Sequence, residues 1–303
     1  MKIERTTNIE VLVKPNIHIF AQIKRNILKN SNMKKAVTLS AFALTAMLML
    51  DSCSCNQQQN TDETIITKQN VAEEVREFVY PLPTAFQITE MLNDIGADYM
   101  ITLCNDENAV DKYVTEAKRA VNLGVYSADV CYASTYNQHA TVMVYMEAIK
   151  KMIDDLDMTQ AVDPELPTKL ENSENNKDEL TNLITDSFYD AYEYLNKNDR
   201  GPVSLLIVSG SWIEGLFLAT HISEYTFNNK EMVKIVLSQK EPLDKLIELL
   251  NKYQEIESIS TMLADLVPLH DIFKDIDDNG ISEAQCASIR TSVEELRNKI
   301  VEY

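Results

Sequence analysis

The segment 203–222 reads VSLLIVSGSWIEGLFLATHI and is the most apolar stretch downstream of the N-terminal region. Its length alone would allow it to span a membrane. Glu214 stands near its centre and His221 near its end, however, and ionisable side chains at these depths of a bilayer are costly. Because apolar residues surround the whole helix instead of one face, we predict a helix buried in the core of a helical domain.

Small residues within this segment indicate close contact with another helix. Ser211, Gly215 and Ala219 recur every four residues and so form one stripe along a helix. Upstream, the sequence 124–126 (GVY) resembles 210–212 (GSW), and alanine followed by serine or threonine stands at the same later offset in both. Both a duplicated helical module and a chance likeness of two buried helices account for this similarity.

The rest of the chain from residue 71 repeats amphipathic helical patterns, with no alternation of strands and helices. Only 6 Gly and 8 Pro occur in 303 residues, too few for the many turns of a β fold. We predict an all-α domain, as a multi-helix bundle or a helical-repeat-like array, with a core supported by about 230 residues. The expected helices cover residues 84–95, 106–124, 126–136, 137–157, 178–196, 203–222, 230–238, 242–255, 258–273 and 282–301.

The N-terminal region resembles an export signal that ends in a cysteine. Met33-Lys34-Lys35 precedes the 15 apolar residues 36–50, a run shorter than a spanning helix needs, and Asp51-Ser52-Cys53 follows. Leu50 and Ser52 fit the lipobox of bacterial lipoproteins, in which the cysteine is acylated, although Asp51 is an unusual residue for its position. We predict lipidation at Cys53; an ordinary signal peptide or an amphipathic helix is the alternative.

These features divide the chain into four parts. Residues 1–32 are a leader of mixed charge or the result of a mis-assigned start, residues 33–52 are the lipoprotein signal peptide, and residues 53–70 are a polar, flexible tether. The all-α domain covers residues 71–303. The tether resembles those of Bacteroidetes lipoproteins, but its acids Asp62 and Glu63 follow Cys53 at a distance, which favours the outer membrane with the domain facing the periplasm over surface display.

The charge of the chain bounds its partners. The formal net charge is −19, and removal of residues 1–52 takes away 8 basic and 3 acidic residues, which leaves −24. Such a surface repels nucleic acid and anionic lipid head groups. We expect contact with the membrane only through the N-terminal lipid, no nucleic acid, and a protein or a small polar molecule as the ligand.

Two predicted helices carry most of the buried polar and aromatic residues. If the helices meet, a carboxylate flanked by tyrosines would bind a small polar ligand; a buried hydrogen-bonded network that fixes the helix register is the simpler interpretation. The candidate ligand-binding residues are Tyr126, Asp129, Tyr132, Tyr136, Trp212, Glu214 and His221.

Metal and cofactor sites have little support. Asp275, Asp277 and Asn279 resemble the first half of a calcium loop, but Cys286 stands where a bidentate glutamate is required. We interpret the segment as a polar turn with Ser282 as the cap of the next helix, and we expect no cofactor. Cys104, Cys131 and Cys286 have no metal-binding spacing, and we expect them in the core. Two of these three cysteines could form one disulfide in an oxidising compartment.

No catalytic motif occurs in the chain, so we assign no catalytic residue. Neither HExxH nor GxSxG is present. A distant pair of acids for sugar cleavage is compatible with an all-α fold, with Glu214 or Asp129 as acid or base.

Three stretches resemble a family of uncharacterised, all-helical lipoproteins of Bacteroidetes. They are PLPTAFQITEMLN at 81–93, NLGVYSAD at 122–129 and SGSWIEGL at 209–216. The resemblance implies an address in the cell envelope and no mechanism. We therefore expect a lipid-anchored, acidic, helical module of the envelope that binds a ligand or a protein. The alternative is an envelope hydrolase that acts on a glycan or a peptidoglycan fragment.

Overall fold

The computed structural model describes residues 85–173, 176–223, 226–276 and 280–302. The predicted leader, signal peptide and tether, together with Cys53 and Thr84, lie outside these residues. Within them every regular element is a helix, which confirms the all-α prediction. The α-helices are α3 (Ala85–Asp94), α4 (Glu116–Thr135), α5 (His139–Asp155), α6 (Leu166–Asn172), α7 (Lys177–Lys197), α8 (Gly201–His221), α9 (Lys230–Leu237), α10 (Lys240–Asn251), α11 (Glu257–Lys274) and α12 (Glu283–Val301). Short 3₁₀ helices are η2 (Ile101–Leu103), η3 (Glu107–Lys112), η4 (Thr159–Ala161) and η5 (Thr226–Asn228).

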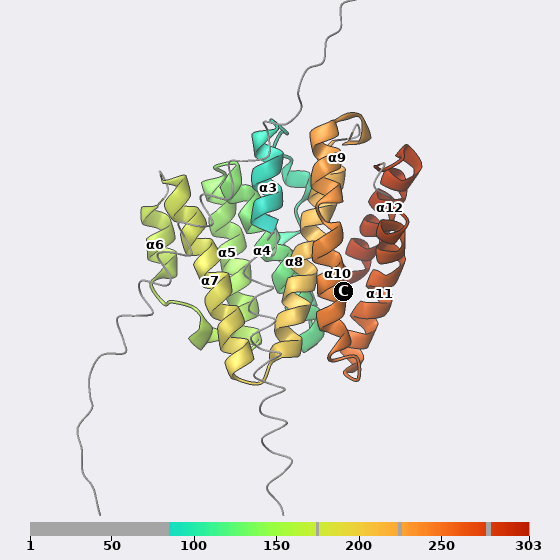
Figure 1. The fold of residues 1–303 in the computed structure, drawn as a ribbon. Helices are drawn as coiled ribbons and strands as arrows, with labels where there is room; N and C mark the ends of the chain where they lie inside the picture. Colours follow the sequence, from blue (N-terminus) through green and yellow to red (C-terminus); the bar gives the residue numbers. More distant parts are fainter. Residues whose placement is uncertain (1–84, 174–175, 224–225, 277–279, 303) are drawn as a thin grey trace, which may run out of the picture. The chain divides into compact units, whose positions relative to one another are not determined.

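The apolar segment forms α8, which lies at the centre of the helical domain. Figure 1 shows α8 with α5, α6 and α7 on one side and α10, α11 and α12 on the other. In the described part of the chain it is the one helix long and apolar enough to cross a membrane, and 83% of its most apolar window is buried by neighbouring helices. The all-round apolar pattern thus reflects contacts on every side of the helix.

Helices α4 and α8 touch backbone to backbone at two glycines. A Cβ atom on Gly124 would lie 2.0 Å from the carbonyl oxygen of Ile207, and one on Gly210 would lie 1.9 Å from that of Val121. Only glycine tolerates such an approach. Gly215 of the predicted small-residue stripe serves α3 instead, because its Cβ would lie 2.8 Å from the Cδ1 atom of Ile88.

Contacts with α12 show that α4 and α8 run in the same direction. Near its N-terminus α4 meets the end of α12, where Asn122 Nδ2 donates to the carbonyl oxygen of Ile300 at 2.8 Å. Glu214 of α8 pairs with Arg297, and further along the chain Arg290 Nη1 donates to the carbonyl oxygen of Ser223 at 3.4 Å. Both helices are therefore antiparallel to α12 and parallel to each other.

Several expected helix boundaries were wrong, and one helix was missed. Helix α10, for example, ends at Asn251, four residues before its expected end. Gly124 does not end a helix, because it is needed at the contact with α8, and residues 116–135 form the single helix α4. Residues 107–112 form η3, and α4 begins only after Thr115, whose side chain accepts a hydrogen bond from the backbone N–H of Lys118. Helix α6 occupies part of the stretch 164–177 that was expected to be a connection.

Candidate functional site

A buried ion pair lies where α4, α8 and α12 meet. Glu214 is fully buried on α8, and its carboxylate accepts two hydrogen bonds from Arg297 of α12, with Nε 3.0 Å from Oε2 and Nη2 3.1 Å from Oε1. This two-point contact matches the planar guanidinium to the planar carboxylate. A charge at this depth requires such a partner, so Arg297 is what allows Glu214 to remain in the core.

Asp129 of α4 adds a second buried carboxyl group to this pair. Its Oδ2 atom accepts a hydrogen bond from the backbone N–H of Asn105 at 3.0 Å, and its Oδ1 atom is buried without a hydrogen-bond partner of normal geometry within the described structure. The thiol of Cys104 is a further side-chain neighbour of this carboxyl group. Burial, and next the neighbouring Glu214, raise the pKa of Asp129 well above its usual range. We infer that Asp129 keeps its proton and that Glu214 is the ionised member opposite Arg297.

Tyr126 fastens the loop before η3 to the core. Its hydroxyl group donates to the carbonyl oxygen of Asp106 at 2.5 Å. The hydroxyl group of Tyr145 donates to the carbonyl oxygen of Asn105 at 2.5 Å, and the Asn105 side chain donates to the hydroxyl oxygen of Tyr113 at 3.0 Å. These bonds hold the Asn105 backbone N–H against Asp129.

Tyr132 and Tyr136 belong to a separate aromatic cluster with Tyr99. The ring centroid of Tyr132 lies 4.8 Å from that of Tyr99 and 5.1 Å from that of Tyr136. The Tyr132 hydroxyl oxygen accepts a hydrogen bond from the backbone N–H of Met100 at 2.8 Å, and burial raises its pKa to about 12. The cluster holds the segment after α3 against α4.

His221 lies near the C-terminal end of α8 and stacks on Phe217, with ring centroids 4.2 Å apart. Its Nδ1 atom is 3.0 Å from the carbonyl oxygen of Phe217, and its Nε2 atom is 3.7 Å from a carboxylate oxygen of Glu294. Burial lowers the pKa of His221. The ring is therefore neutral at pH 7 and packs as an aromatic group.

A cavity of about 910 Å³ lies on another side of α4 and α8. Helices α5 and α7 and the segment from η4 to α6 complete its walls. The lining is mainly apolar and includes Leu123, Ile149, Phe188, Ile207 and Trp212. Neither Asp129 nor Glu214 is among the lining residues.

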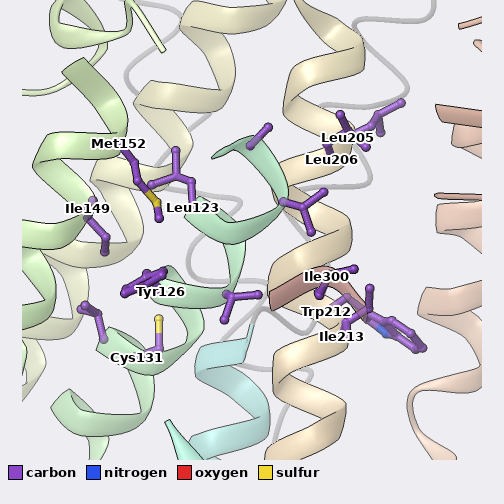
Figure 2. Close-up of a cluster of buried hydrophobic side chains, with 14 of the residues drawn as sticks. Leu123, Tyr126, Cys131, Ile149, Met152, Leu205, Leu206, Trp212, Ile213 and Ile300 are labelled. Carbon is purple, nitrogen blue, oxygen red and sulfur yellow. The ribbon is translucent and has the colours of Figure 1, made fainter. Parts of the chain in front are cut away.

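Figure 2 shows how the side chains divide between the two sides of the central helices. Leu123 of α4 lies beside Ile149 and Met152 of α5, whereas Trp212 and Ile213 extend from α8 away from α5. Trp212 is 2% exposed, and its Nε1 atom has no hydrogen-bond partner within the described structure.

The seven candidate residues thus lie on helices that do meet, but they do not converge on one ligand. Glu214 pairs with Arg297, and Asp129 lies beside this ion pair. Tyr126 holds a loop, Tyr132 and Tyr136 pack against Tyr99, and His221 packs on Phe217. Trp212 borders the cavity, while its indole ring extends away from α5. Sequence reasoning missed Arg297 and the cavity. The seven-residue spacing of Arg290 and Arg297 on one predicted helix was an available signal for the first.

The calcium-loop candidate is described only in part. Asp275 is the C-cap of α11, while Asp277 and Asn279 lie outside the described residues. Ser282 caps α12 in a capping box with Gln285, as predicted for the cap. Where the chain is described, Cys104, Cys131 and Cys286 are free thiols.

Comparison with known proteins identifies no relative. No family model matches the chain, and neither a curated protein nor a solved structure matches it. The functional interpretation therefore rests on the residues and their geometry.

Proposed function

We propose that this chain is a lipid-anchored protein of the bacterial cell envelope whose helical domain binds a small, largely apolar molecule. The observation that carries the proposal is the cavity of about 910 Å³ between α4, α5, α7 and α8. Its size is that of a ligand site, and its walls would remove apolar ligand surface from water. The small polar ligand expected from the sequence fits these walls less well than an apolar one.

The anchor would be attached at Cys53. A Lys-Lys start, an apolar run and a Leu50–Cys53 lipobox support acylation there, and the resemblance to helical Bacteroidetes lipoproteins supports the same address. Two or three acyl chains hold a protein on a membrane far more firmly than one chain does. With the tether 53–70, the domain would work close to the outer membrane on its periplasmic side.

The geometry favours this function over an envelope hydrolase. A catalytic acid and base need access to substrate, whereas Asp129 and Glu214 are each 0% exposed. Glu214 accepts hydrogen bonds from Arg297, and Asp129 accepts one from the backbone N–H of Asn105. The Cys104 thiol is no better a nucleophile, because burial raises its pKa and keeps it protonated.

A cavity-filling substitution tests the binding function. Ala191 of α7 lines the cavity, so Ala191→Trp would place an indole ring inside it, whereas Ala287→Trp adds the same ring to the exposed face of α12. The probe is N-phenyl-1-naphthylamine, an uncharged dye that fluoresces in apolar surroundings, added to residues 53–303 carrying Cys53→Ser.

We expect saturable dye binding that Ala191→Trp weakens at least about tenfold, while Ala287→Trp leaves it unchanged. Ala191→Leu gives a milder filling if the tryptophan disturbs folding, which circular dichroism and thermal melting would reveal. Absence of saturable binding, or equal binding by a folded Ala191→Trp variant and the parent, would contradict the proposal.

A further inference from the structure

The mouth of the cavity carries an unequal set of charges. Glu147, Lys150 and Asp154 of α5 and Asp163 before α6 belong to its lining, and all four are exposed. Asp163 is neutralised in part by Lys169, with Nζ at 2.5 Å. Two acidic residues, Glu147 and Asp154, and one basic lining residue, Lys150, then remain at the mouth. The net charge of −19 for the whole chain makes the electrostatic potential there more negative.

The serines of the wall add hydrogen-bond acceptors deeper in the cavity. The hydroxyl groups of Ser127, Ser187 and Ser204 each donate to a carbonyl oxygen of their own helix, at 2.6, 2.8 and 2.7 Å respectively. Their protons are thus used within the helix, and only oxygen lone pairs are left for a ligand.

Most of the remaining wall is apolar; its other polar groups belong to Thr159, Gln160, Tyr192, Ser211 and Trp212. We place the polar part of a ligand at the mouth because the charged lining residues there are exposed. Methylene groups inside the cavity contribute through burial, each by about fourfold in affinity. A head group that donates hydrogen bonds and carries positive charge would meet the carboxylates of Glu147 and Asp154. A carboxylate or phosphate head group would be repelled by them.

We propose that the cavity takes a single-chain amphiphile with a cationic amine head group, the chain lying between α5, α7 and α8 and the ammonium group at the acidic mouth. This inference rests on the proposed binding function and specifies its ligand class. Lys150 limits the preference, because it stands three residues after Glu147 and four before Asp154 and so shares their face of α5.

A matched series of C12 compounds tests the head group. Dodecylamine, 1-dodecanol and dodecanoate share one chain and differ in charge, and each would displace bound N-phenyl-1-naphthylamine below its aggregation concentration. We expect dodecylamine to bind most tightly, about tenfold ahead of dodecanoate, with 1-dodecanol between them, since exposed charge pairs are individually weak. Added salt should reduce the difference in affinity between dodecylamine and dodecanoate. Decylamine, which has two fewer methylene groups, should bind about fifteenfold more weakly than dodecylamine.

The double variant Glu147→Gln/Asp154→Asn localises the effect. It should reduce the preference for dodecylamine over 1-dodecanol, measured as the ratio of their affinities for the same variant. Glu255→Gln/Glu295→Gln removes the same charge from exposed carboxylates outside the cavity lining and should leave the preference intact.

The outcomes separate the two proposals. Dye binding with equal displacement by all three compounds, or with dodecanoate strongest, would overturn the amine assignment and leave the binding function standing. Dye binding without displacement by any C12 chain would overturn the amphiphile class. Failure of the dye itself to bind would overturn the binding function and with it this inference.

Discussion

The substitution Asp129→Asn probes the buried carboxyl pair with the smallest change of shape. An asparagine resembles a protonated aspartate, since its side-chain oxygen can accept from the Asn105 N–H and its amide group can donate toward Glu214. The native state then no longer requires a proton at this position. The two proteins should therefore differ in how their free energy of unfolding depends on pH.

The sign and size of the difference follow from linkage. The usual pKa of an aspartate, 3.8, applies to the unfolded chain, and burial beside Glu214 raises the pKa of Asp129 in the folded state. Between these two values the folded state binds the additional proton, so the stability that Asp129 contributes is full below pH 3.8 and falls as the pH rises toward the folded-state pKa. Relative to Asp129→Asn, the unmodified protein should lose about 1.4 kcal/mol of unfolding free energy per pH unit in this window.

Urea unfolding followed by circular dichroism at about pH 5, 6 and 7 would measure the difference, with equal m-values as the check that both proteins unfold alike. Glu107→Gln, which changes an exposed carboxyl group on η3, is the control for the removal of a carboxyl group outside the core. A constant difference between Asp129→Asn and the unmodified protein across this range would refute proton retention by Asp129.

Three further substitutions test the surroundings of this pair. Arg297→Met removes the partner of a fully buried Glu214 and should cost about 3–5 kcal/mol in urea unfolding at neutral pH, whereas Arg290→Met, which loses only a 3.4 Å contact with a carbonyl oxygen, should cost less. His221→Gln removes a ring whose pKa is lowered by burial, so the unmodified protein should lose stability relative to this variant as the pH falls below 6.5. If the unfolding free energies of the two proteins changed equally with pH, the result would count against burial of a neutral ring. Gly210→Ala should cost more than about 3 kcal/mol in thermal or urea unfolding, because its Cβ would lie 1.9 Å from a backbone oxygen, while Gly201→Ala, whose Cβ would first meet a side-chain oxygen at 3.1 Å, should be nearly neutral.

The fold class could be predicted from the sequence because helical periodicity and capping are local properties. Both ends of α5, α7 and α12 lie within two residues of their expected positions. Gly124 was misinterpreted because a glycine that ends a helix and one that admits a neighbouring helix look alike in sequence. The contact with Ile207, which decides between them, is formed by a residue far along the chain.

The candidate site was predictable only as far as the two helices that carry it. That α4 and α8 meet follows from their small and apolar faces, but the partner of Glu214 comes from the last helix of the chain. The cavity depends on how far α7 stands from α5 and α8. Phe188 and Ala191 of α7 are half-buried in the cavity wall, but they are residue types that are equally common on the buried face of a packed helix. Sequence alone therefore does not distinguish a cavity wall from a packed interface.

Native mass spectrometry of the protein extracted from bacterial membranes tests the central claim most directly. We expect a mature chain that begins at an acylated Cys53 and retains an apolar small molecule, with the acyl mass absent from Cys53→Ser and the small molecule absent from Ala191→Trp. An unmodified Cys53 would contradict the lipid anchor. An acylated chain that carries no small molecule, or carries it equally in the Ala191→Trp variant, would contradict binding in the cavity.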